Sequence, residues 1–248
     1  NIFGWQTDHD GRLRVATTYD GVNKSLLYRD TEKDDFQVLL TSSFKETLVP
    51  LFFTYDNRNL YVASNIGRDK IAVYEYDIKE KKQTTLLYEN PDVDIENLLR
   101  SDKRKTVTAV AYYTDKRRYH FLDEERAKLQ QDIESRLPGY EVSLTNMSRD
   151  ETKALVYAGS DRTLGTYYFY DLTTSDFRKL ADVGPWLVEA ELAEMKSITY
   201  TSRDGLTIHG YLTLPRLADE RERPRARVVP GHAGGVIRVV FITAHLVI

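Results

Sequence analysis

Apolar and polar residues alternate in twos along short segments of the first three quarters of this chain. In one clear unit, an apolar segment at 60–64 leads through a polar turn into a second at 71–77, and a third follows at 83–88. The short apolar segment 51–54 precedes them. Because alternation with period two is typical of strands with one buried face, this unit predicts a four-stranded antiparallel meander.

The same unit recurs four times at a nearly constant interval. One landmark is an aspartate at the end of an aromatic-rich strand, at Asp30, Asp77, Asp123 and Asp171. A second landmark is the apolar residue that opens a strand, at Leu13, Leu60, Val107 and Leu155. The first landmark repeats at intervals of 47, 46 and 48 residues, which fits the blade of a β-propeller. A mainly β fold is therefore predicted, with about four four-stranded blades over residues 1–187 that stack on one another.

Residues 123–137 interrupt the β pattern. Apolar residues there recur at four-residue spacing, at Leu129, Ile133 and Leu137. Asp123 is a favourable N-cap, and the acids Glu124 and Glu125 suit the positive end of a helix. The segment predicts an amphipathic helix outside the sheets that packs Leu129 and Ile133 onto a blade. The paired acids also leave open a site for a cationic group such as a peptide amine.

The pattern changes again near residue 188. A short helical stretch is predicted at 188–195, followed by alternating strands at 197–202 and 206–215 on either side of an Arg-Asp-Gly turn. An Asp-Gly turn between alternating segments is a strong hairpin signal. We therefore assign residues 188–248 to the start of a second domain. His209 falls in the second strand, where a solvent-facing role is expected.

Composition limits the classes of partner. The chain has 248 residues, 41% of them hydrophobic, which is enough for a substantial core. Its net charge of -3 argues against a nucleic-acid or acidic-membrane surface, and no apolar stretch is long enough to predict a membrane span. The sequence has no cysteine, which excludes disulfides and thiolate chemistry but does not select a compartment.

Candidate catalytic residues find little support in the sequence. A hydrolase of the nucleophile-elbow type needs a serine in G-x-S-x-G with a base in reach, and the sequence contains no such motif. Ser160 is interpreted as a hairpin serine, and Ser42 with Lys45 as a chance match to S-x-x-K. The histidines show no metal-ligand spacing, at His9, His120, His209, His232 and His245. No catalytic, cofactor-binding or metal-ligating residue is predicted.

The segment from Ile198 to Pro215, placed after a propeller-like repeat, carries a family resemblance. Its Arg-Asp-Gly turn and Leu-Thr-Leu-Pro ending resemble the start of the catalytic domain in serine peptidases of the prolyl oligopeptidase family, including the acylaminoacyl-peptidase and dipeptidyl-peptidase branches. The resemblance implies a propeller that admits peptides and excludes folded proteins, beside an α/β-hydrolase domain that cleaves oligopeptides through an acyl-enzyme. Residues 188–248 would be the first strands of that hydrolase domain, with the catalytic serine outside this sequence.

The end of the sequence departs from the family pattern. A His-Gly-Gly-Pro loop is expected there, but Pro230 precedes His232 and the run ends at Gly235, so these residues are assigned no role. The tail from Arg216 holds six arginines and no lysine, which is compatible with a divergent end or with a change of reading frame. We expect a catalytically inactive propeller portion whose partner is a peptide. The alternative is a non-enzymatic propeller that binds a peptide or protein.

Overall fold

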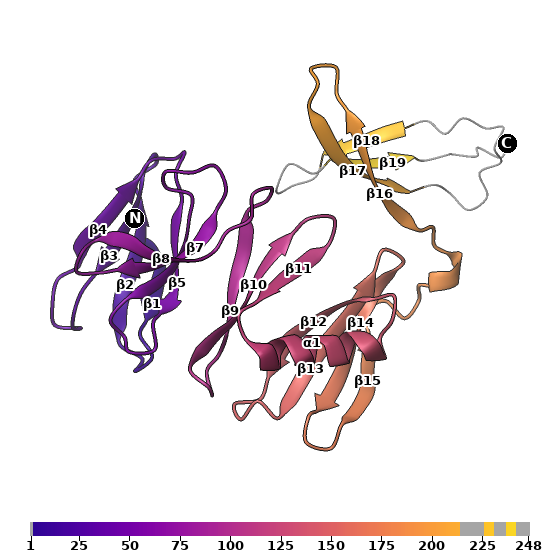
Figure 1. The fold of residues 1–248 in the computed structure, drawn as a ribbon, viewed down its shortest axis with the longest axis horizontal. Helices are drawn as coiled ribbons and strands as arrows, with labels where there is room; N and C mark the ends of the chain where they lie inside the picture. The colour runs from indigo at the N-terminus through magenta and orange to yellow at the C-terminus, as the bar shows by residue number, and fades with distance from the viewer. Residues whose placement is uncertain (1, 214–225, 231–236, 242–248) are drawn as a thin grey trace. The chain divides into compact units, whose positions relative to one another are not determined.

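A computed structural model describes residues 2–213, 226–230 and 237–241 (Figure 1). The chain divides into two compact units, one ending at Lys128 and the other beginning at Leu129. Almost all of the regular structure is antiparallel sheet, in which each strand pairs with the strand next to it in sequence.

Two four-stranded sheets open the first unit, and both follow chain order. Blade 1 consists of β1 (Ile2–Thr7), β2 (Leu13–Tyr19), β3 (Lys24–Tyr28) and β4 (Gln37–Ser42). Blade 2 consists of β5 (Leu48–Phe53), β6 (Leu60–Ser64), β7 (Ala72–Asp77) and β8 (Lys82–Tyr88). These are the meanders that the alternating pattern predicts.

Blade 3 differs from the prediction. It has three strands, β9 (Ile95–Ser101), β10 (Thr106–Tyr113) and β11 (Arg117–Phe121), and helix α1 (Glu124–Arg136) follows directly. The expectation of four strands was therefore wrong for this unit. The reason is local: Asp123 caps the helix by accepting a hydrogen bond from the Arg126 N–H at 2.8 Å, so the chain leaves the sheet after its third strand.

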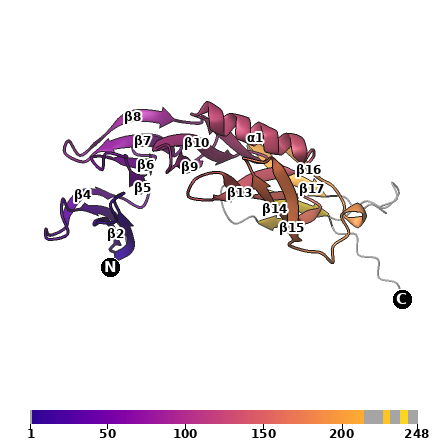
Figure 2. The same cartoon turned by 90° about the horizontal axis from the view of Figure 1, so that it is seen from below.

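Blade 4 lies in the second unit and is again four-stranded. It consists of β12 (Glu141–Met147), β13 (Lys153–Ser160), β14 (Thr163–Asp171) and β15 (Asp176–Asp182). The buried side chains of Ile133 and Leu137 from α1 pack with Val142 and Val156 of this sheet, and Leu129 joins their edge. Figure 2 shows α1 lying along the sheet. The predicted helix and its packing are confirmed.

Both sequence landmarks have a structural cause. The landmark apolar residues all lie in the second strand of their blades, at Leu13, Leu60, Val107 and Leu155. At the end of β7, the Asp77 carboxylate accepts hydrogen bonds from the N–H groups of Lys79 and Glu80, each at 2.9 Å. Asp171 accepts in the same way from Thr173 and Thr174. At Asp77 and Asp171 the repeated aspartate therefore forms an Asx turn that reverses the chain, whereas at Asp123 it caps α1.

Beyond blade 4, the predicted helical stretch is only the three-residue 3-10 helix η1 (Glu189–Glu191). Strand β16 (Met195–Thr201) starts at once and pairs antiparallel with β17 (Thr207–Thr213), which confirms the hairpin. Gly205 supplies the positive φ of +84° that its turn requires. Strand β19 (Ile237–Phe241) pairs parallel with β17, and β18 (Ala226–Pro230) pairs antiparallel with β19. A boundary at residue 188 and a hydrolase domain beyond it stay predictions.

Blades 1 and 2 share one core and are joined by a partly buried arginine. The core cluster draws Val15 and Leu26 from blade 1 and Leu60 and Val62 from blade 2. The Arg14 guanidinium lies 5.1 Å from the ring centres of Tyr28 and Phe53, one from each blade. It also donates to the Asn57 carbonyl at 2.9 Å. These contacts fix the two blades to each other.

Candidate functional site

Ser160 ends strand β13 and has no histidine among its hydrogen-bond partners in the described residues. Its Oγ accepts from the Arg162 N–H at 3.1 Å and lies 3.5 Å from Glu189 Oε1, to which it donates. A carboxylate at that distance is a poor base for a serine hydroxyl, whose activation needs a closely placed imidazole or comparable group. The arrangement is that of a hairpin serine.

The other serine and histidine candidates are also separate from one another. Ser42 is buried at the end of β4 and donates to the Lys24 carbonyl at 3.5 Å, while Lys45 lies in the following turn. His9 stacks on Tyr55 at 4.5 Å, and His120 stacks on Tyr88 at 4.2 Å. These imidazoles are held as aromatic packing groups. His209 lies exposed in β17, whereas His232 and His245 fall outside the described residues.

The paired acids at the start of α1 serve the helix. Glu124 lies 3.7 Å from Lys128, and Glu125 lies 3.4 Å from Arg104. The Glu124 side chain is 92% exposed, so it provides no enclosed site for a cation. Arg104 also forms two hydrogen bonds with Asp123, at 2.6 and 2.8 Å, and this pairing holds the pKa of Asp123 below its usual range.

The described residues hold neither a candidate metal site nor a candidate membrane-spanning helix. They contain no group of three or more acidic or histidine side chains placed to hold a metal ion. Within the same residues, no helix has the length and apolar character of a membrane span.

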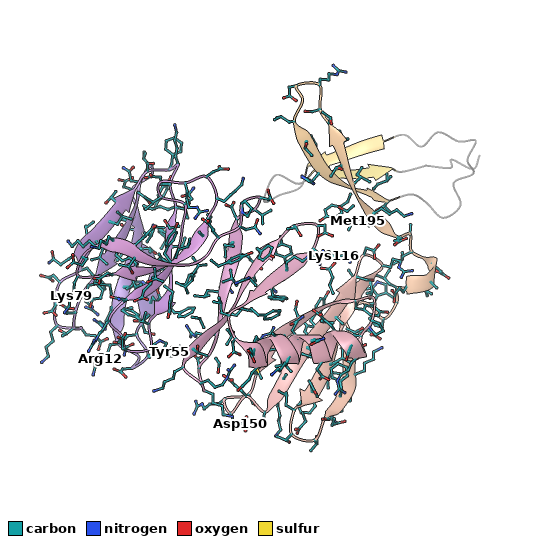
Figure 3. The ribbon with its side chains drawn as sticks, in the orientation of Figure 1. Arg12, Tyr55, Lys79, Lys116, Asp150 and Met195 are labelled. Atoms are coloured by element: carbon teal, nitrogen blue, oxygen red, sulfur yellow. The ribbon has the colours of Figure 1, made fainter. Side chains whose placement is uncertain are left out.

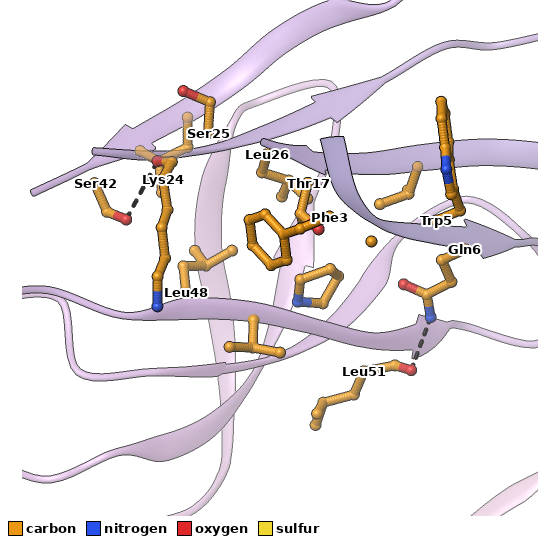
Figure 4. A pocket seen from close by; sticks show the side chains of 15 residues that line it. Phe3, Trp5, Gln6, Thr17, Lys24, Ser25, Leu26, Ser42, Leu48 and Leu51 are labelled. Carbon is orange, nitrogen blue, oxygen red and sulfur yellow. Dashed lines mark hydrogen bonds between the residues drawn. The ribbon is translucent and has the colours of Figure 1, made fainter. Parts of the chain in front are cut away.

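A cavity of about 330 Å³ lies between blades 1 and 2 (Figure 4). Its apolar wall includes Phe3 and Trp5 from β1 and Leu48 and Val49 from β5. Phe3 is 62% exposed and Trp5 is 56% exposed, so both present apolar surface to solvent beside the cavity. The volume lies at the lower end of the range for small-ligand pockets.

Backbone bulges shape both sides of this cavity. In β1, Ile2 pairs with Thr18 and Gly4 with Thr17, so Phe3 is an extra residue in the ladder. In β5, Pro50 and Phe52 pair with consecutive residues of β6, which makes Leu51 the extra residue. A bulge bends its strand and redirects the side chain that it carries. Figure 4 shows Phe3 projecting into the middle of the cavity.

Two polar side chains lie at opposite ends of the cavity (Figure 4). Among the fifteen described residues that line it, Lys24 alone carries a charge. Gln6 donates from Nε2 to the Leu51 carbonyl at 2.7 Å, while its buried Oε1 has no hydrogen-bond partner within the described part of the chain. The cavity thus combines an apolar wall with one cation and one unused acceptor. This cavity could not be predicted from the sequence, because a bulge is visible only once the pairing of two strands is known.

The fold defines a class of protein: a series of β-propeller blades followed by a hairpin of a further sheet. No family model matches the sequence. The chain is 29% identical over 192 residues to dipeptidyl aminopeptidase BIII of Pseudoxanthomonas mexicana. The matched region covers 77% of this chain and 27% of that protein.

Solved peptidase structures share the fold. The structural match with a puromycin hydrolase covers 97% of this chain and 41% of the hydrolase chain, with a TM-score of 0.63 and 18% sequence identity. The structural match with a prolyl endopeptidase covers 96% of this chain and 37% of the endopeptidase chain, with a TM-score of 0.64 and 15% sequence identity. The chain therefore spans well under half the length of these proteins. The comparisons confirm the resemblance: the chain is similar in sequence to a dipeptidyl aminopeptidase and shares its fold with the propeller-containing part of these peptidase structures.

Proposed function

We propose that this chain is the substrate-gating propeller portion of a serine peptidase that hydrolyses oligopeptides through an acyl-enzyme. The observation that carries the proposal is the series of four blades at a nearly constant period, which peptidase structures match over almost the whole chain. The sequence contains no G-x-S-x-G elbow, so the nucleophile would come from a hydrolase domain and not from these blades.

Gating by this portion would depend on blades that resist separation. Arg14 joins blades 1 and 2 through aromatic rings on both sides. At the next junction, Arg100 of β9 lies 4.4 Å from the ring centre of Phe52 in β5. Each contact combines cation–π attraction with close packing. A rigid wall of this kind would pass a flexible peptide and exclude a folded protein by size.

The test is a comparison of size selection in a protein that carries this chain next to a hydrolase domain. We expect that protein to cleave an unstructured oligopeptide but not the same sequence inside a folded, stable host domain. Removing residues 1–187 should allow cleavage of the folded host, provided that the hydrolase domain still cleaves the free peptide. Equal exclusion of the folded host with and without residues 1–187 would contradict the gating role.

The cavity between blades 1 and 2 favours a second candidate, a non-enzymatic propeller that binds a peptide or protein. Its wall of exposed aromatic side chains is of the kind found at binding surfaces. The two candidates differ in one measurable property: only the first requires an adjoining domain with a reactive serine.

A further inference from the structure

We propose that the cavity between blades 1 and 2 binds the C-terminal residue of an extended peptide, with an apolar side chain against Phe3 and the terminal carboxylate at Lys24. This inference goes beyond gating, because it concerns a binding site in the chain itself and holds whether or not a hydrolase domain adjoins it. Three features of the cavity support it, and each corresponds to one group of the ligand.

The first feature is the charge. Among the described residues, the lining of the cavity contains one cation, Lys24, and no acid. The Lys24 ammonium forms no ion pair within the described residues. In Figure 4 its side chain extends from β3 toward Leu48 across one end of the cavity. A single ammonium beside apolar walls complements a ligand with one negative charge. A carboxylate also makes stronger hydrogen bonds to an ammonium than a neutral amide does.

The second feature is the apolar wall. Phe3, Leu48 and Val49 line the same space, and Val49, in the edge strand β5 of blade 2, is 44% exposed. An apolar side chain in this space would remove these groups from water, which is the main source of favourable free energy for such a contact. The volume of about 330 Å³ suits one or two residues better than a long chain.

The third feature distinguishes a peptide from a simple fatty acid. Gln6 Oε1 is a buried acceptor that no donor in the described part of the chain reaches, and a peptide N–H would satisfy it whereas an alkyl chain could not. Gln6 lies at the end of the cavity away from Lys24, with Phe3 between them (Figure 4). A peptide bound along the cavity would therefore have its N–H at Gln6, its side chain beside Phe3 and its carboxylate at Lys24.

The free edge of blade 1 is compatible with this direction. Strand β1 is an edge strand of its sheet and pairs only with β2 among the described residues. Unpaired backbone groups at a sheet edge are the usual partners of an extended peptide. The bulge at Phe3 bends this strand beside the cavity and limits how far a peptide could pair with it.

The experiment uses the whole chain and two matched tripeptides, acetyl-Ala-Ala-Leu with a free carboxylate and the same peptide as its C-terminal amide. Binding is measured by calorimetry at low salt. We expect the acid to bind about tenfold more tightly than the amide, the ratio that one charge-assisted contact provides. Lys24→Met should reduce this ratio to about one because it keeps the length of the side chain and removes the charge.

The matched control is Lys79→Met, which removes an exposed lysine at the tip of the β7–β8 hairpin, labelled in Figure 3, and should leave the ratio unchanged. Val49→Trp should fill the cavity and weaken both peptides. Equal binding of acid and amide to the unaltered chain would overturn the proposal without any variant. So would the absence of binding at about 1 mM peptide, an unchanged ratio in Lys24→Met, or decanoate binding as tightly as the peptide acid.

Discussion

Replacing Ile133 by Asp tests whether α1 is a structural part of the fold or only lies on its surface. The Ile133 side chain is 1% exposed and packs with Val142 and Val156 of blade 4. Full burial of such a side chain contributes about 1.5–3 kcal/mol, and the substitution also brings a charge into this apolar contact. The nearest cation along the helix, Arg136, is already paired with Asp132 at 3.0 Å.

We therefore expect Ile133→Asp to lower the free energy of unfolding by about 2–4 kcal/mol. With a urea dependence of about 2 kcal/mol per molar, the unfolding midpoint measured by circular dichroism should fall by about 1–2 M. Gln131→Asp is the matched control, because it places the same charge on the exposed face of the same helix and should cost less than about 0.5 kcal/mol. Equal midpoints for the two variants would refute the packing of α1 on blade 4.

Three further outcomes follow from single side chains. Asp123→Ala removes the helix cap and should lower the free energy of unfolding by about 1 kcal/mol at neutral pH, as measured by urea titration. Because Arg104 lowers the pKa of Asp123, this difference in stability should persist above about pH 4 and disappear as the pH falls further. Burial and the neighbouring Asp30 raise the pKa of Tyr28 to about 12. The contribution of Tyr28 to stability should therefore be complete below about pH 10 and lost as the pH rises through about 12. An ultraviolet titration in which Tyr28→Phe removes no late-titrating tyrosine would contradict this. Gly165→Ala should destabilise by more than about 1 kcal/mol, since φ is +98° and a Cβ would overlap the Tyr157 ring, whereas Gly21→Ala, with φ of +106° and open space, should cost less in the same thermal melts.

The repeat could be predicted from the sequence because its signals are local. An aspartate that accepts from the N–H groups two and three residues further on, as Asp77 does, forms a turn at the end of its strand. The alternation around Leu60 identifies a strand with one buried face. The helix could also be predicted from the sequence, because its cap, its first-turn acids and its apolar spacing all fall within residues 123–137. These signals fixed blades 1, 2 and 4 and the hairpin closed by Gly205.

The three-stranded blade 3 and the cavity could not be predicted, because both depend on pairing between distant residues. The sequence predicts a helix beside a four-stranded unit, whereas α1 follows the third strand of blade 3 directly. The bulge at Phe3 is defined only by its partners Thr17 and Thr18. The position of Lys24 beside Leu48 and Val49 likewise depends on how blade 2 lies against blade 1.

The central claim is that this chain supplies a peptidase propeller and not the catalytic nucleophile. The most direct measurement is treatment of the purified chain with a fluorophosphonate probe, which reacts only with an activated serine. We expect no stoichiometric labelling and no hydrolysis of aminoacyl or prolyl chromogenic amides. Labelling of one serine, abolished by its replacement with alanine, would contradict the account; Ser160 is the first position to replace, because Arg162 and Glu189 already contact its hydroxyl.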